Sequence, residues 1–197
     1  MILGKTVLGI IPARGGSKRL PNKNILSLAG KPMISWSIEA GLKSDYIDEI
    51  IVSSDSTKIL NIAKKYEILT IKRPNVLATD KANSFDVIQH AVENINDKFD
   101  FVILLQPTSP LRDFSHINQA FEVLHKKKAD AIISISKTNH SPLWCNKIPK
   151  DGSMVDFLKK DVLNKRSQDL KKFYRINGAI YICKTEKLLK QKTFFMI

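Results

Sequence analysis

A short loop near the N-terminus carries the residues best suited to chemistry. An apolar run at 7–11 leads into the segment 12–24, which contains Gly15, Gly16 and four cations: Arg14, Lys18, Arg19 and Lys23. Glycines let the backbone turn sharply and bring its N–H groups close to an anion, while guanidinium and ammonium groups supply the opposite charge. The loop therefore predicts a socket for a polyanion, with a triphosphate as the expected ligand; a plain β-to-α turn is the alternative.

The elements around this loop alternate between two periodicities. Short apolar strand-like runs lie at 7–11, 49–53, 67–71, 101–105 and 130–135, and segments with helical spacing separate most of them. This alternation predicts an α/β fold with a doubly wound, mostly parallel sheet and helices on both faces. Ligands of such sheets bind beyond the carboxyl ends of the strands, so we expect the loops 13–24, 54–55, 72–84 and 106–113 to converge on one site.

Composition restricts the class of protein. A length of 197 residues with 43% hydrophobic residues suits one buried core, and no apolar run approaches the length of a membrane span. No secretory signal pattern is visible, and Cys145 and Cys183 lack metal-ligand spacing, so we expect a cytoplasmic protein with reduced thiols. The four histidines fit no base or metal constellation and are interpreted as structural.

The net charge of +13 raises the alternative of a nucleic-acid-binding protein. Most of the excess lies in lysine doublets at the ends of helix-like segments, which are typical of solvated surface. No aromatic residues interleave with the cations as single-strand binding requires, so we expect neither a nucleic-acid nor a membrane partner.

The alternation is lost between residues 136 and 176. This stretch contains Trp144, Met154, Val155 and a turn signal at 149–152 between two extended pieces. We interpret 136–176 as an inserted arm that makes a homodimer contact. Residues 1–135 and 177–197 then form the nucleotide-binding and catalytic domain.

Four ordered motifs resemble the acylneuraminate cytidylyltransferases, or CMP-sialic acid synthetases, including their legionaminate and pseudaminate relatives. They are Ile11-Pro12-Ala13-Arg14-Gly15-Gly16-Ser17-Lys18 with Asn22-Lys23-Asn24, Arg73-Pro74 with Leu77-Ala78-Thr79-Asp80 and Asn83-Ser84, Leu104-Leu105-Gln106-Pro107-Thr108-Ser109-Pro110-Leu111-Arg112, and Asn177-Gly178-Ala179-Ile180-Tyr181. The resemblance spans residues 7–195 and implies a Rossmann-like nucleotidyltransferase fold. The implied reaction moves CMP from CTP to the anomeric hydroxyl of a nine-carbon 2-keto sugar acid and releases pyrophosphate.

The resemblance also implies which residues bind each substrate. It gives catalytic, charge-stabilising roles to Arg14 and Lys23. The implied nucleotide-binding residues are Ala13, Arg14, Ser17, Lys18, Lys23, Asn24, Arg73, Asn83 and Ser84, and the implied sugar-binding residues are Gln106, Arg166, Tyr181, Phe194 and Phe195.

A purely structural role stays open for several of these residues. Ser84 also reads as a plain helix N-cap, and Arg166 also reads as a surface cation. The segment 106–110 fits a rigid loop, while Tyr181, Phe194 and Phe195 fit an apolar core.

The sequence departs from the family pattern at the position of the magnesium ligands. Relatives continue past the phenylalanine pair into an Asp-x-Asp segment that helps to hold Mg²⁺, whereas this sequence stops at Ile197. The chain therefore offers no protein metal ligands of that kind, and we expect Mg²⁺ to enter mainly on the CTP phosphates. We expect a C-terminally truncated fragment rather than a naturally short form, with poor or no turnover.

Three alternatives remain beside the hypothesis of an acylneuraminate-type cytidylyltransferase. They are an enzyme for 3-deoxy-octulosonate or another sugar nucleotide, the basic nucleic-acid-binding protein, and a CTP-binding protein without catalysis. An octulosonate enzyme would place an acid just after the 104–105 strand, where this chain has Pro107 and Thr108. The sequence does not choose among the nine-carbon acceptors.

Overall fold

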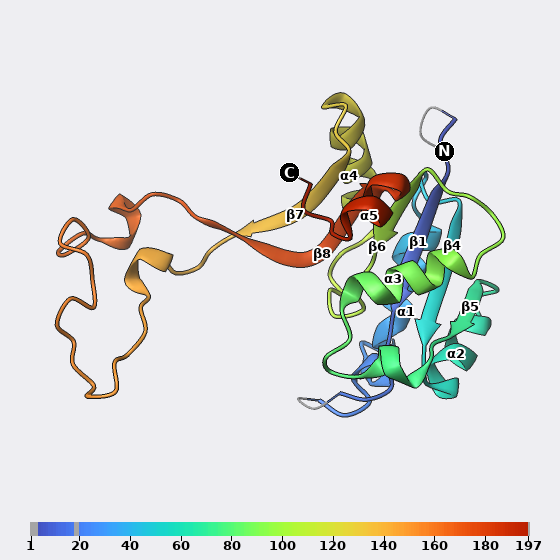
Figure 1. The fold of residues 1–197 in the computed structure, drawn as a ribbon, viewed down its shortest axis with the longest axis horizontal. Coiled ribbons are helices and arrows are strands. Elements are labelled where there is room, and N and C mark those ends of the chain that lie inside the picture. The colour runs from blue at the N-terminus through green and yellow to red at the C-terminus, as the bar shows by residue number, and fades with distance from the viewer. Residues whose placement is uncertain (1–3, 18–19, 197) are drawn as a thin grey trace. The chain divides into compact units, whose positions relative to one another are not determined.

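The computed structural model describes residues 4–17 and 20–196, and its chain divides into two compact units. The first unit comprises 1–134 with 178–197, and the second comprises 135–177. The first contains the sheet shown in Figure 1, which has the order β5-β4-β1-β6-β8-β7. Its strands are β1 (Val7–Pro12), β4 (Glu49–Ser54), β5 (Leu69–Lys72), β6 (Phe101–Leu104), β7 (Ala131–Lys137) and β8 (Tyr174–Lys184).

Strand directions confirm the predicted doubly wound, mostly parallel sheet. Strand β1 lies in the middle and pairs in parallel with β4 on one side and β6 on the other. Strand β5 adds in parallel to β4, whereas β8 pairs antiparallel to β6. The strand order reverses direction around β1, so the loop that follows β1 lies at the switch point where such sheets bind ligands.

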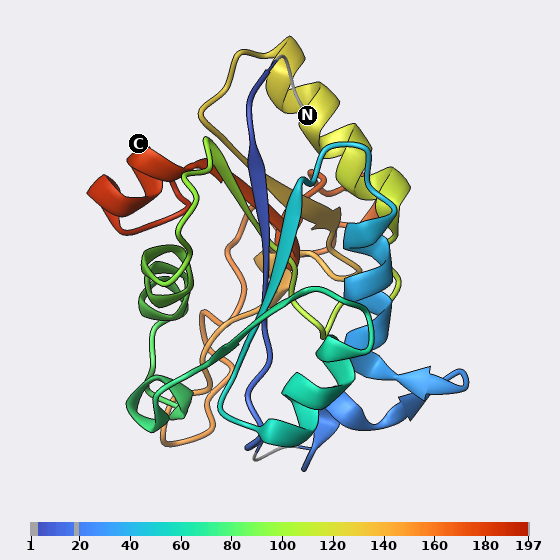
Figure 2. The ribbon, with the colours of Figure 1, turned by 90° about the vertical axis from the view of Figure 1, so that its right-hand side faces the viewer.

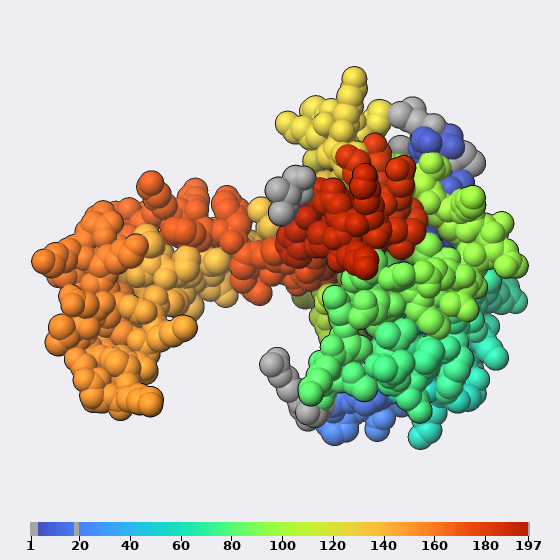
Figure 3. Space-filling model, in the orientation of Figure 1, coloured from blue at the N-terminus to red at the C-terminus, as the bar shows by residue number. Residues whose placement is uncertain are grey.

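Helices cover both faces of this sheet, as Figure 2 shows. Side chains of α1 (Met33–Leu42), α2 (Thr57–Lys64) and α4 (Phe114–Lys126) join one hydrophobic cluster, and those of α3 (Ser84–Glu93) and α5 (Thr185–Gln191) join the other. The helices α3 and α5 cover the face of the first unit that Figure 3 presents. Short elements complete the first unit: η1 (Lys23–Ile25), η2 (Asn75–Ala78) and the hairpin of β2 (Ser27–Leu28) with β3 (Lys31–Pro32).

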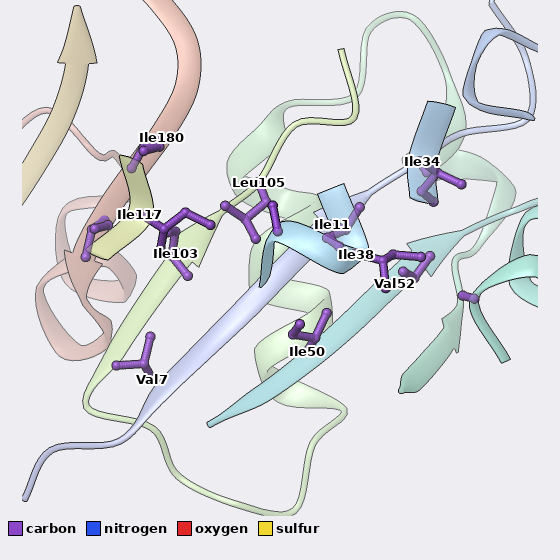
Figure 4. Close-up of a cluster of buried hydrophobic side chains, with 14 of the residues drawn as sticks. Val7, Ile11, Ile34, Ile38, Ile50, Val52, Ile103, Leu105, Ile117 and Ile180 are labelled. Atoms are coloured by element: carbon purple, nitrogen blue, oxygen red, sulfur yellow. The ribbon is translucent and has the colours of Figure 1, made fainter. Parts of the chain in front are cut away.

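The central strand explains why the apolar runs in the sequence are continuous. Val7 and Ile11 point into one cluster, and Leu8 and Ile10 point into the other, all with no exposed surface. A parallel strand covered on both faces needs apolar residues at successive positions, which removes the alternation typical of a half-exposed strand. Figure 4 shows the first cluster, in which Val7 and Ile11 lie among isoleucines of α1 and neighbouring strands.

The N-terminus of α3 corrects one local prediction. Ser84 is the first helical residue, and the cap is Asn83, whose side-chain oxygen accepts a hydrogen bond from the Phe85 N–H at 3.0 Å. Asparagine is as good an N-cap as serine, so the sequence alone did not separate the two neighbours.

The second unit is built mostly from loops. Strands β7 and β8 extend into it, and between them lie η3 (Pro142–Trp144) and η4 (Ser167–Asp169). The predicted turn at 149–152 is present, because the Gly152 N–H donates to the Pro149 carbonyl at 3.0 Å. The extended pieces expected on either side of it are not strands among the described residues. No helix in the described ranges is both long and apolar enough to cross a bilayer.

The two cysteines differ in reactivity. Cys145 is exposed, whereas Cys183 is buried, and burial raises the pKa of the Cys183 thiol to about 11. Since the thiolate is the reactive form, we expect iodoacetamide at pH 8 to modify Cys145 in the native protein and Cys183 only after denaturation. Mass spectrometry of the labelled peptides checks this, and equal labelling of both thiols in the native state would contradict it.

Candidate nucleotide-binding site

A cavity of about 330 Å³ lies beyond the carboxyl ends of β1 and β6. Six residues predicted from the sequence line it: Arg14, Lys23, Asn24, Arg73, Ser84 and Gln106. They come from three loops, 13–24, 72–84 and 106–113, that the parallel sheet brings to one edge. The expected convergence is therefore present for these three loops, whereas the loop 54–55 does not line the cavity; the binding roles stay a prediction.

The glycine loop is held by side chains from two directions. Asn24 is buried and donates from Nδ2 to the Arg14 carbonyl at 2.9 Å. On the other side, the Gly15 N–H donates to Oδ1 of Asp55 at 2.8 Å. We expected the Gly15 N–H to point at phosphate, but in this structure it bonds Asp55. A Cβ on Gly15 would lie 2.9 Å from the Ser56 Cβ, so this position requires glycine.

The Arg14 guanidinium has a partner that sequence reasoning missed. Its Nη2 lies 2.6 Å from Oδ1 of Asp80, a residue of the segment between η2 and α3. Asp80 is the one acidic residue among the cavity-lining residues described, beside the cations Arg14, Lys23 and Arg73. The signal was available, since Asp80 stands in a loop expected at the site.

Arg73 lines the cavity but is almost completely buried. It is 4% exposed and donates to the Ser53 carbonyl from Nη2 at 2.6 Å and to the Leu77 carbonyl from Nη1 at 3.3 Å. Burial lowers its pKa, and the nearby positive charge of Arg14 lowers it further. These contacts fix the end of β4 to η2, so Arg73 supports the loop that carries Asp80.

The other predicted nucleotide-binding residues that the structure describes are not among those that line this cavity. The Ala13 N–H donates to the Ser53 carbonyl at 2.9 Å, so this donor is not available to a nucleotide. Ser17 lines a neighbouring open cavity of about 430 Å³ together with Arg14 and Asp80. Asn83 serves as the α3 cap described above, while Lys18 lies outside the described residues.

Gln106 is positioned by two further residues that the sequence reasoning did not assign. The buried Arg112 donates from Nε to the Ala179 carbonyl at 3.1 Å, and its Nη2 reaches the Ser37 hydroxyl at 2.8 Å and the Gln106 carbonyl at 3.4 Å. Burial lowers the Arg112 pKa to about 10. Gly178 has a φ of +78°, and a Cβ there would lie 3.1 Å from Gln106 Oε1. Arg112 thus ties the Gln106 loop to β8 and α1, and Gly178 leaves room for the Gln106 side chain.

Gly152 provides a matched control for Gly178. Both glycines have positive φ, so Gly178→Ala and Gly152→Ala carry a similar backbone strain, but no atom lies within 4 Å of a Cβ at Gly152. On the acceptor-binding role that the resemblance implies for Gln106, we expect Gly178→Ala alone to move Gln106 and to raise the KM for the acceptor about 3- to 10-fold, while the KM for CTP stays within error. Steady-state kinetics of both variants test this, and equal effects on the two substrates would contradict it.

Tyr181, Phe194 and Phe195, the remaining predicted sugar residues of the first unit, are not among the residues that line this cavity. Tyr181 packs against Phe194 with ring centroids 5.5 Å apart, in the cluster formed by α3 and α5. Phe194 is buried, Phe195 is 51% exposed, and burial raises the pKa of Tyr181. Arg166 belongs to the second unit, where its Nε bonds Asp169 at 3.0 Å. Their sugar-binding roles remain predictions.

The described residues do not form a resident metal site. Within 4–17 and 20–196 no group of three or more histidine, cysteine or carboxylate side chains is close enough to hold an ion. Asp80, the acid of the cavity lining, is already paired with Arg14. Hard cations such as Mg²⁺ require several oxygen ligands, and this side-chain set does not supply them.

A cationic cavity at the switch point of a doubly wound sheet defines a nucleotide-binding α/β protein. Residues 8–195 match the family described as cytidylyltransferase. The chain belongs to this family, which confirms the resemblance drawn from the motifs.

Two curated relatives illustrate the similarity. The N-acylneuraminate cytidylyltransferase of Streptococcus agalactiae serotype V is 39% identical over 188 residues, covering 94% of this chain and 45% of that protein. The CMP-N,N'-diacetyllegionaminic acid synthase of Legionella pneumophila is 38% identical over 202 residues, covering 96% of this chain and 82% of that protein. The chain thus spans less than half of the first relative and most of the second.

A solved structure supports the fold. The CMP:2-keto-3-deoxy-manno-octonic acid synthetase, complexed with CTP, aligns with a TM-score of 0.70 and 19% identity over 97% of this chain and 80% of that one. At this identity the likeness bears on the fold alone, and it confirms the predicted Rossmann-like nucleotidyltransferase architecture.

Proposed function

We propose that this chain transfers CMP from CTP to the anomeric hydroxyl of a nine-carbon 2-keto sugar acid. The observation that carries the proposal is the cavity that gathers Arg14, Lys23, Ser84 and Gln106 at the end of β1. The names of the two curated relatives, an N-acylneuraminate and a diacetyllegionaminate enzyme, support this class of acceptor.

The proposed reaction needs no protein nucleophile. The sugar hydroxyl oxygen attacks the α-phosphorus, the bond from that phosphorus to the bridging oxygen breaks, and pyrophosphate leaves with the bond electrons. The hydroxyl proton passes to solvent. The protein's task is to hold the two substrates in line and to stabilise the charge that develops on the phosphoryl oxygens.

Each residue of the predicted site has a part in that task. Arg14 and Lys23 stabilise charge on the triphosphate, with Asn24 fixing the Arg14 backbone. Ser17 and Lys18 complete the phosphate cradle, and Asn83, Ser84, Ala13 and Arg73 form or support the nucleoside side. Gln106 contacts the acceptor, for which Arg166, Tyr181, Phe194 and Phe195 remain further candidates. Mg²⁺ enters on the CTP phosphates.

An acceptor panel tests the function. The full chain is incubated with CTP, Mg²⁺ and N-acetylneuraminate, legionaminate, pseudaminate or 3-deoxy-octulosonate, and pyrophosphate release is followed with CMP-sugar formation. We expect the turnover of this chain to be low and a nine-carbon acid to be used. Selective use of octulosonate would establish the related sugar nucleotidyltransferase instead. Tight CTP binding without product would indicate a non-catalytic CTP-binding protein, and RNA binding with a steep salt dependence and no CTP preference would reject the proposal.

The second unit supports a homodimer as part of this proposal. Ile148, Met154 and Val155 of the arm are 71%, 63% and 79% exposed, which is unusual for apolar side chains of one short segment. A second copy of the chain is the partner that we propose for this surface. Sedimentation velocity of the wild type and of a Met154→Lys/Val155→Lys variant tests it, with a loss of dimer expected.

A cytoplasmic location suits an enzyme that consumes CTP.

A further inference from the structure

Two described anion-binding groups of the glycine loop, the Gly15 N–H and the Arg14 guanidinium, bond carboxylates of the chain itself. The Gly15 N–H donates to Asp55 Oδ1 at 2.8 Å, and Arg14 Nη2 bonds Asp80 Oδ1 at 2.6 Å. A carboxylate and a phosphate present similar oxygen acceptors to a guanidinium, so a ligand phosphate and Asp80 compete for the same donors.

The two carboxylates differ in access. Asp80 is 40% exposed and lines both the main cavity and the neighbouring one, so a ligand can reach its contact with Arg14. Asp55 lines neither cavity, and its backbone carbonyl also accepts a hydrogen bond from Lys72. Asp55 is therefore a fixed anchor of the loop, while Asp80 occupies a position that a ligand can take.

We propose that Asp80 is a specificity-determining residue that a ligand must displace from Arg14. The proposal deepens the proposed function and rests on it for the identity of the ligand. A small phosphate anion gains only the contact that Asp80 gives up. A nucleoside triphosphate gains contacts along the whole cavity, from Lys23 to Ser84, and these offset the lost ion pair. Asp80 thereby selects a multivalent nucleotide against free phosphate and pyrophosphate, because only the nucleotide gains further contacts that offset the displaced ion pair.

The test uses titration calorimetry of the full chain with phosphate, pyrophosphate and CTP, with EDTA present so that no metal bridges the carboxylate. Asp80→Asn is compared with Asp97→Asn, which removes the same charge from an exposed position outside both cavities. We expect Asp80→Asn to bind pyrophosphate about 3- to 10-fold more tightly and CTP with a smaller gain, in keeping with the loss of one partly exposed ion pair. Asp97→Asn binds as the wild type does.

Two further variants make the result specific. In an Arg14→Ala background, we expect Asp80→Asn to raise the affinity for pyrophosphate at most by the general effect of removing one negative charge, because the pair of Arg14 with Asp80 no longer exists. Asp55→Asn weakens binding, since it loosens the loop rather than frees a cation.

The outcomes separate this inference from the function. If the wild type makes CMP-sugar but Asp80→Asn binds pyrophosphate no more tightly than Asp97→Asn, the inference is overturned and the function stands. If Asp80→Asn binds pyrophosphate more tightly but no acceptor is used, the competition stands and the function fails. If neither the wild type nor Asp80→Asn binds pyrophosphate or CTP, the inference is overturned as well.

Discussion

Arg14→Ala and Lys23→Ala are each expected to lower the rate of CMP transfer about 10²- to 10³-fold, the magnitude seen when one preorganised charge-stabilising donor is removed. Both side chains line the main cavity, and Asn24 fixes the backbone that presents Arg14. Because the roles proposed for Arg14 and Lys23 act on charge that grows as pyrophosphate leaves, the larger part of the loss is expected in kcat. Single-turnover transfer with saturating CTP measures it directly.

The control is a lysine of the same charge at another place. Lys126→Ala removes an exposed cation at the C-terminal end of α4, outside the cavity lining, and is expected to leave the rate within about twofold. If all three variants lose the same activity, the general positive field of the protein is responsible, and specific roles for Arg14 and Lys23 would have to be abandoned.

The sequence predicted the parts of this fold that depend on short-range pattern. Continuous apolar runs identify strands such as β1 and β6, because both of their faces are covered. The same reasoning named the loops that meet at the cavity, since carboxyl ends of parallel strands share one edge. It placed the α3 cap one residue late, because Asn83 and Ser84 are equally suited to the position.

Pairings between distant segments were beyond that reasoning. Asp55, Asp80 and Arg112 stand in the expected loops, but which partner each one meets depends on how β4, η2 and β8 are placed in three dimensions. The same limit applies to Tyr181 and Phe194. Their apolar neighbours in the sequence suit a core and a ligand wall equally, and in the structure the two rings pack on each other.

The second large effect is expected from one methyl group in the glycine loop. A Cβ at Gly15 would lie 2.9 Å from the Cβ of Ser56, a separation that side chains do not adopt, so Gly15→Ala must shift the loop or the start of α2. Overpacking of this kind costs about 1–3 kcal/mol, and here part of the strain is relieved by breaking the Gly15 to Asp55 hydrogen bond. Since that bond holds the backbone next to Arg14, we expect CTP affinity to fall at least about 10-fold.

Its neighbour supplies the control. A Cβ at Gly16 meets no atom of the described residues within 4 Å, so Gly16→Ala is expected to bind CTP nearly as the wild type does. Ser56→Gly removes the clashing atom, and the double variant Gly15→Ala/Ser56→Gly should recover most of the lost affinity. CTP titrations of the four proteins decide the matter. If Gly16→Ala is as damaging as Gly15→Ala, or if Ser56→Gly gives no rescue, the loop needs its glycines for close approach to the ligand and not for packing against Ser56.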